Sequence, residues 1–129
     1  MKIKKLIPFL LSMFLFAGCS TVDNQQKGVK HVSMNEAIQM MEKESGYIIL
    51  DVRTPEEFAE GHIANAINIP NESIGSAELS QLPKKDQLIF VYCRSGRRSK
   101  EAAQKLANLG YTNIVEMGGI NDWNGELEV

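Results

Sequence analysis

The 129-residue sequence lacks several features that would place it in other classes of protein. It contains no internal repeat, and its length allows one domain. It has only two cysteines, Cys19 and Cys93. Its main apolar stretch, residues 6–17, is shorter than the roughly 20 residues that a membrane-spanning helix needs.

An excess of positive charge is also absent. The chain has 14 Lys and Arg against 16 Asp and Glu, and three of the basic residues precede position 18 whereas every acidic residue follows it. Residues 19–129 therefore carry 11 positive and 16 negative charges, a net charge of about −5. Such an acidic chain is a poor candidate for binding nucleic acid, and we expect no nucleic-acid partner.

The first eighteen residues have the pattern of a secretory signal. Three lysines precede the short apolar stretch, and the small residues Ala17 and Gly18 end it. Cys19 follows at once, and the segment Leu15-Phe16-Ala17-Gly18-Cys19 resembles the lipobox of bacterial lipoproteins. That resemblance implies a signal peptide over residues 1–18 and a lipid on Cys19, which would become the mature N-terminus.

A lipid on Cys19 would place the protein outside the cytoplasm, anchored to the bacterial cell membrane. The alternative is an ordinary cleaved signal followed by an incidental cysteine. Residues 19–29 are polar and without periodicity, so we expect a flexible tether there. Residues 30–129 then form the folded domain.

Buried strands and helices alternate through that domain. Capping boxes at Ser33 and Thr54 predict helices over residues 33–44 and 54–60, and a third helix is expected over 97–109. Apolar runs predict strands at 47–52, 67–69, 88–92 and 113–117, with a short one near residue 31. Segment 61–66 is expected to be a loop, segment 71–86 to hold one or two short helices, and a last short helix to carry Trp123.

This alternation predicts an α/β domain with a mostly parallel central sheet of four to five strands and helices on both faces. Ligands of such sheets bind at the carboxyl ends of the strands. Asp51 and Cys93 both end predicted strands, so we expect both to face one crevice.

The turn between strand 88–92 and helix 97–109 carries the candidate chemistry. If Cys19 carries a lipid, Cys93 has no intrachain partner and is a free thiol. The following helix N-terminus, the backbone N–H groups of residues 94–98 and the nearby arginines all favour its thiolate form. Gly96 permits the sharp turn, and the same N–H groups can bind an incoming anion. The turn reads Cys93-Arg94-Ser95-Gly96-Arg97-Arg98-Ser99-Lys100.

Several segments, in order, resemble the rhodanese family of sulfurtransferases. They are Leu50-Asp51-Val52-Arg53, Glu56-Glu57-Phe58, Gly61-His62-Ile63, Ala66-Ile67-Asn68-Ile69-Pro70, the Cys93 loop, Gly110-Tyr111 and Gly118-Gly119 with Trp123. The resemblance implies a rhodanese-like fold in which the loop cysteine accepts a sulfane sulfur as a persulfide and passes it on. It implies a small anionic donor such as thiosulfate, a polysulfide or a persulfide, an acceptor that is cyanide or a thiol, and neither cofactor nor metal.

By the same resemblance, Cys93 is the nucleophile and the loop residues after it form the cradle for the substrate. Asp51 is expected to pair with Arg98 and hold the loop closed, with Ser99 supporting the loop. The cradle comprises Arg94, Ser95, Gly96, Arg97 and Arg98, although Arg97 is expected to set local charge in solvent more than to contact substrate.

Other interpretations of the loop remain. Cysteine phosphatases place five residues between cysteine and arginine, whereas four separate Cys93 from Arg98, and this tighter loop favours sulfur transfer. A non-enzymatic, lipid-anchored persulfide carrier or sensor would need the same loop. Cys93 could also be a buried structural cysteine. We expect His62 to have a packing or hydrogen-bonding role, and we assign no role to His31.

Overall fold

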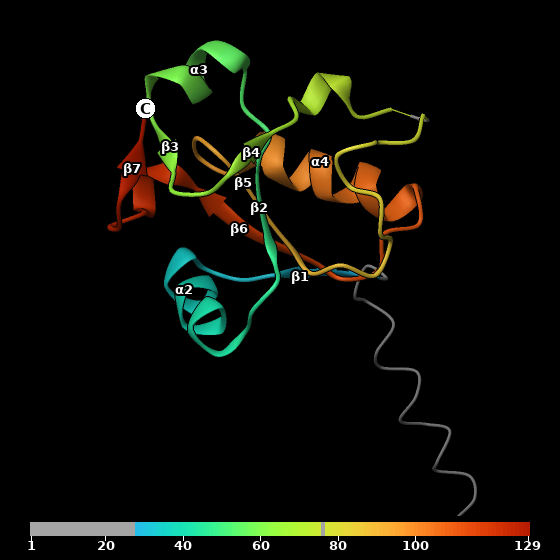
Figure 1. Cartoon of the computed structure of the whole chain (residues 1–129), viewed down its shortest axis with the longest axis horizontal. Coiled ribbons are helices and arrows are strands. Elements are labelled where there is room, and N and C mark those ends of the chain that lie inside the picture. Colours follow the sequence, from blue (N-terminus) through green and yellow to red (C-terminus); the bar gives the residue numbers. More distant parts are fainter. Residues whose placement is uncertain (1–27, 76) are drawn as a thin grey trace, which may run out of the picture.

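The computed structural model describes residues 28–75 and 77–129 (Figure 1). The predicted signal peptide, Cys19 and all but the last two residues of the predicted tether lie outside these residues. Within the described ranges, no helix is both long and apolar enough to cross a membrane.

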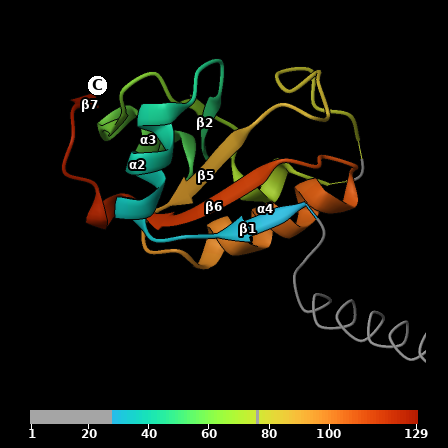
Figure 2. The same ribbon diagram turned by 90° about the horizontal axis from the view of Figure 1, so that it is seen from below.

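A five-stranded parallel sheet forms the centre of the domain, as the alternation of strands and helices predicted. Figure 2 shows three of its strands, β5, β6 and β1, lying side by side. Every neighbouring pair in this sheet is parallel, so the carboxyl ends of all its strands lie at one edge. The strand order is β1 (Val29–His31), β6 (Ile114–Gly119), β5 (Ile89–Cys93), β2 (Ile48–Asp51) and β4 (Ile67–Asn68).

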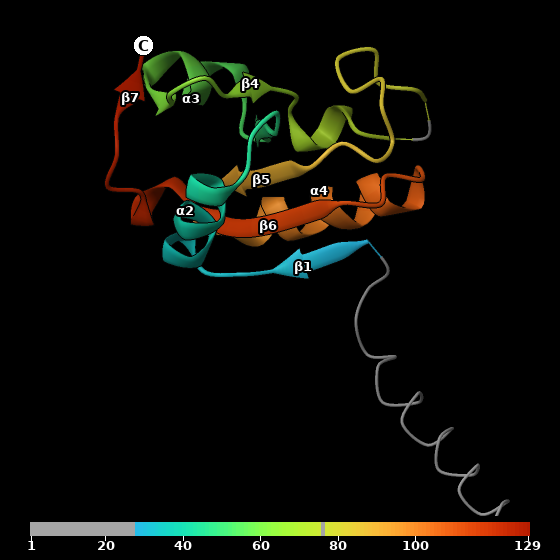
Figure 3. The same cartoon turned by 60° about the horizontal axis from the view of Figure 1, so that its bottom comes forward.

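Helices cover both faces of the sheet (Figure 3). Helix α4 (Arg97–Asn108) packs on one face, where Leu50 and Val91 belong to its buried cluster. Helix α2 (Met34–Lys43) packs on the other face, over Ile49 and Phe90. Because successive side chains of a strand point to opposite faces, the position of a residue along its strand decides which helix it meets.

Local sequence signals account for where the helices begin. Ser33 and Thr54 are the N-caps of α2 and α3 (Pro55–Glu60), and each forms the predicted capping box. Helix α4 has no side-chain cap, because its N-cap is Gly96. Its first turn is therefore open toward the loop that precedes it.

Short elements differ most from the prediction. Segment 61–66 contains β3 (His62–Ile63), which pairs antiparallel with β7 (Leu127–Glu128) near the C-terminus. The described residues of segment 71–86 hold one 3₁₀ turn, η3 (Asn71–Ser73), and η4 (Ile120–Asp122) ends just before Trp123. Two-residue strands and single turns are too short to leave a periodic pattern in the sequence.

Candidate active site

Cys93 is the last residue of β5 and is 1% exposed. The backbone N–H of Gly96 donates a hydrogen bond to its sulfur at 3.0 Å, and the Ser99 hydroxyl lies 3.5 Å from the same sulfur. Gly96 has a φ of +120°, a conformation that glycine adopts at little cost. The sulfur therefore sits at the N-terminus of α4, where the sequence predicted it.

The Gly118-Gly119 turn packs directly behind this loop. Gly119 pairs with Cys93 in the register between β5 and β6. A Cβ atom on Gly119 would overlap the carbonyl group of Arg94 and lie 2.6 Å from the Ser95 Cα. Close approach of two backbones thus requires glycine at position 119.

Glu57 of α3 forms ion pairs with two arginines of the loop, Arg94 and Arg98. Its carboxylate accepts two hydrogen bonds from Arg98, at 2.7 and 3.1 Å, and lies 3.3 Å from the guanidinium of Arg94. The hydrogen bonds from Arg98 hold the pKa of Glu57 well below its usual range, and Glu57 in turn raises the pKa of Arg98. The sequence analysis placed Glu57 in the capping box at Thr54, which it also forms, and in a segment that resembles the family, but it assigned Glu57 no contact with the loop.

The predicted pair between Asp51 and Arg98 is wrong. Asp51 is fully buried, and its carboxylate accepts hydrogen bonds from Arg53 at 2.7 to 3.1 Å and from the Tyr92 hydroxyl at 2.6 Å. The reason is the alternation along the strands. Cys93 belongs to the cluster beneath α4, whereas Tyr92 lies in the cluster on the opposite face, and its partner Asp51 lies there too. Asp51 and Cys93 end neighbouring strands but do not share a crevice.

Asp51, Arg53 and Tyr92 instead fasten the segment that carries α3. Arg53 donates to the carbonyl of Gly61 at 2.7 Å, and the Tyr92 oxygen accepts from the N–H of Ile63 at 3.0 Å. Burial, together with the hydrogen bond to Asp51, raises the pKa of Tyr92. This buried group positions Glu57, and through it the arginines, without touching the loop.

His62 has the packing and hydrogen-bonding role that was predicted for it. Its Nδ1 lies 2.8 Å from the carbonyl oxygen of Phe58, and its ring stacks on that of Phe58 at 3.7 Å between centroids. These contacts close α3 onto β3.

A second buried carboxylate, Glu116 of β6, was missed by the sequence analysis. Ser99 donates to it at 2.6 Å, and His31, to which the sequence assigned no role, contacts its other oxygen at 2.9 Å. One sequence signal could have revealed it. Glu116 is a charged residue inside the mostly apolar run 113–117. In the structure its register partner on β1 is His31.

The loop residues after Cys93 differ in their exposure. Arg94, Ser95 and Arg97 are exposed, Arg98 is half-buried and Gly96 is buried. Arg97 pairs with Glu101 one turn along α4. Over residues 28–75 and 77–129, no group of three or more His, Cys, Asp or Glu residues is arranged to hold a metal ion.

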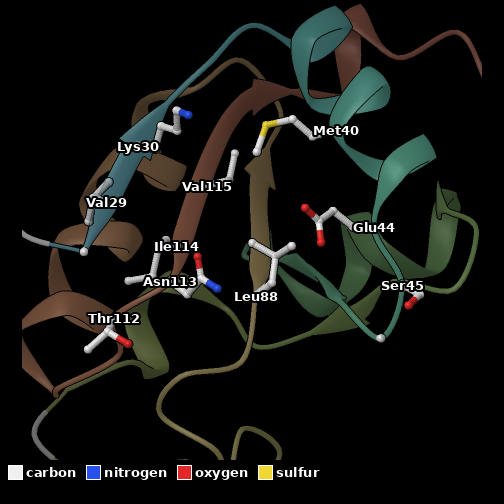
Figure 4. Close-up of a pocket in the computed structure, with 12 residues that line it drawn as sticks. Val29, Lys30, Met40, Glu44, Ser45, Leu88, Thr112, Asn113, Ile114 and Val115 are labelled. Carbon is white, nitrogen blue, oxygen red and sulfur yellow. The ribbon is translucent and has the colours of Figure 1, made fainter.

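A hollow of about 430 Å³ lies elsewhere in the molecule (Figure 4). Leu88 and Asn113, which precede β5 and β6, line it together with Met40 and Glu44 near the end of α2. These residues are at the amino ends of the strands, so the hollow and the Cys93 loop lie at opposite ends of the sheet.

Comparison with known proteins agrees with this geometry. The family model described as "Rhodanese-like domain" matches residues 33–126. The chain belongs to the rhodanese-like family. Thiosulfate sulfurtransferase PspE of Escherichia coli is 37% identical over 73 residues, which are 57% of this chain and 70% of that protein.

Two further relatives of this rhodanese-like chain extend the comparison. The putative sulfur carrier protein YrkF of Bacillus subtilis is 30% identical over 92% of this chain, but the match spans only 64% of that protein. A solved structure described as a rhodanese with anions from E. coli has a TM-score of 0.59 and 33% identity, covering 64% of this chain and 96% of that one.

Proposed function

We propose that this rhodanese-like protein is a sulfurtransferase of the thiosulfate:cyanide type that carries a sulfane sulfur as a persulfide of Cys93. The position of the Cys93 sulfur carries the proposal, because it lies at the open N-terminus of α4 and accepts the Gly96 N–H. A helix N-terminus stabilises negative charge on sulfur and on a bound anion. The family membership and the name of the E. coli relative support the reaction class.

The reaction proceeds by double displacement. The Cys93 thiolate attacks the outer sulfur of thiosulfate, a polysulfide or a persulfide, and forms a new S–S bond. The bond between the two donor sulfurs breaks, and sulfite or the shortened donor leaves with its electron pair. A thiol or cyanide then attacks the outer sulfur of the persulfide, and the electron pair of the broken bond returns to Cys93 as thiolate.

The residues of the loop have different roles in binding the anionic donor. Arg94, which is exposed, and Arg98, which is half-buried, provide the positive charge nearest to the mouth of the loop. Both contact Glu57, so an anionic donor competes with that carboxylate for them. Arg97 adds local charge from solvent. Ser95 and Gly96 contribute backbone N–H groups to the cradle.

We also propose that the protein is an extracytoplasmic lipoprotein, anchored to the bacterial cell membrane by a lipid on Cys19. The lipobox-like segment that ends at Cys19 supports this. Stable anchoring requires more than one acyl chain, which is what a modified lipoprotein cysteine would provide.

Sulfur loading tests the enzymatic proposal. The full chain, purified in detergent, is incubated with thiosulfate, its intact mass is measured, and cyanide is then added to measure thiocyanate. We expect a gain of one sulfur atom and repeated formation of thiocyanate. Cys93→Ser should abolish both, whereas Cys19→Ala should retain both. Failure to load from thiosulfate, polysulfide and persulfide alike would refute the proposal.

The second candidate is a persulfide carrier or sensor that does not turn over. The name of the Bacillus relative, a putative sulfur carrier, favours it. The same assay separates the two, since a carrier loads one sulfur without sustained formation of thiocyanate.

A further inference from the structure

Glu116 is a buried carboxylate that the sulfur-transfer steps do not use. It is 2% exposed and lies on the α4 side of the sheet, as Cys93 does. One of its oxygens accepts from the Ser99 hydroxyl at 2.6 Å and from the Gly118 N–H at 2.9 Å. Ser99 lies between this carboxylate and the Cys93 sulfur.

The hydroxyl of Ser99 has only one proton to donate. Carbonyl oxygens of Gly96 and Gly118 lie within its reach, at 2.9 and 3.3 Å, but the charged Glu116 oxygen is nearer. A charged acceptor at short distance gives the stronger hydrogen bond. Ser99 therefore turns a lone pair, not its proton, toward Cys93.

The Ser99 contact of the Cys93 sulfur is then suited to a thiol and not to a thiolate. The Gly96 N–H donates to the sulfur, and the Ser99 oxygen can accept the S–H proton at 3.5 Å. A thiolate has no proton to give, so it gains nothing from that lone pair. The negative charge of Glu116, the carboxylate to which Ser99 donates, opposes a second negative charge on the sulfur.

Groups from β1 and α4 face Glu116. His31 of β1 contacts its second oxygen at 2.9 Å, and the Lys100 ammonium of α4 lies 3.8 Å from that oxygen. Cys93 is the group on the β5 side, reached through Ser99. His31 is the outer end of this chain of contacts, because 46% of its side chain is exposed.

We propose that Glu116 is a positioning residue that restrains the reactivity of Cys93 by holding the proton of Ser99 away from the sulfur. Removing the negative charge of Glu116 frees that proton to donate to the thiolate. The inference rests on the proposed function for its biological meaning, since it concerns the same cysteine. Its test does not require sulfur transfer.

Alkylation of Cys93 measures the effect directly. The full chain with Cys19→Ala, purified in detergent, has Cys93 as its single thiol, and its rate of reaction with iodoacetamide is followed from about pH 5 to about pH 10. We expect Glu116→Gln to move the midpoint of this profile down by about one pH unit, or about tenfold in thiolate population near neutral pH. In a Ser99→Ala background, the same substitution should move the midpoint less than half as far.

One control and one further test variant complete the experiment. Glu101→Gln removes a carboxylate from the exposed side of α4 and should leave the profile in place. His31→Ala changes an exposed side chain at the end of β1 and removes its hydrogen bond to the Glu116 carboxylate, so the negative charge there is less well stabilised and the midpoint should move upward. This second variant keeps the test decisive if Glu116→Gln does not fold, as judged by circular dichroism.

Three results would overturn the inference. They are an unchanged or higher midpoint in folded Glu116→Gln, an equal shift with and without Ser99, and an unchanged or lower midpoint in His31→Ala. Failure of sulfur loading with these alkylation shifts intact would refute the proposed function alone.

Discussion

Replacing Asp51 with asparagine tests the buried group that fastens α3 to the sheet. The substitution keeps the size of the side chain but removes its charge. Arg53, which is 5% exposed, then keeps a positive charge without its counter-ion. Tyr92 still finds an acceptor in the asparagine carbonyl, so the principal loss is the ion pair.

The cost follows from the burial of both partners. Removing one member of a buried ion pair costs about 3–5 kcal/mol, because the remaining charge is uncompensated. The carbonyl of Gly61, which accepts from Arg53 at 2.7 Å, offsets part of this. We therefore expect Asp51→Asn to lower the free energy of unfolding by about 3 kcal/mol. That is a large part of the roughly 5–15 kcal/mol typical of a domain.

Urea unfolding provides the measurement, with the single tryptophan, Trp123, as the fluorescent probe. A double-mutant cycle with Arg53→Met separates the pair from its surroundings. Once Arg53 is replaced, Asp51→Asn no longer leaves a charge unpaired, so its cost should fall by about 2 kcal/mol. A parallel cycle with Arg98→Met should show little coupling, because Arg98 pairs with Glu57.

Either of two outcomes would refute this reasoning. One is a cost below about 1 kcal/mol for Asp51→Asn, which is the range of an exposed pair. The other is a stronger coupling of Asp51 to Arg98 than to Arg53, which would restore the pairing that the sequence suggested.

Three further predictions concern the loop and the anchor. Glu57→Gln should lower the free energy of unfolding by about 1–2 kcal/mol at pH 7. Because Arg98 lowers the pKa of Glu57 in the folded state, this difference in stability should shrink as the pH falls below the ordinary value of 4.5. Urea unfolding at pH 7 and at about pH 3.5 measures it. Gly119→Ala should force the Arg94 carbonyl aside, costing about 1–3 kcal/mol and slowing sulfur loading by at least about tenfold in the intact-mass assay. Cys19→Ala should release the protein from the membrane pellet on fractionation, and retention there would contradict the lipid anchor.

Much of the fold could be predicted because it depends on local signals. The capping boxes at Ser33 and Thr54 set the starts of two helices, and the apolar runs set the strands. The position of Cys93 is equally local, since a strand that ends in a cysteine and turns at Gly96 into a helix places the sulfur at the helix N-terminus.

The ion pairs could not be predicted in the same way. Glu57 and Arg98 belong to elements far apart in the chain. Asp51 and Arg53 are only two residues apart, but their pairing depends on which face of the sheet Asp51 takes. Asp51 lies one residue too early in β2 to face α4, which is why Arg53 and not Arg98 is its partner. Glu116 lies on the α4 side of β6, but nothing in the sequence shows that β6 would run beside β1.

The carboxylates around the loop also change how its positive charge should be understood. Arg94, Arg97, Arg98 and Lys100 place four cations within seven residues of an acidic chain. In the structure three carboxylates lie within ion-pair distance of them, which leaves about one net positive charge. The pairs are Arg94 and Arg98 with Glu57, Arg97 with Glu101, and Lys100 with Glu116. Attraction of a donor anion therefore depends more on the backbone N–H groups at the start of α4 than on the long-range electrostatic field of the loop cations. Because salt screens only that field, added salt should weaken sulfur loading only modestly.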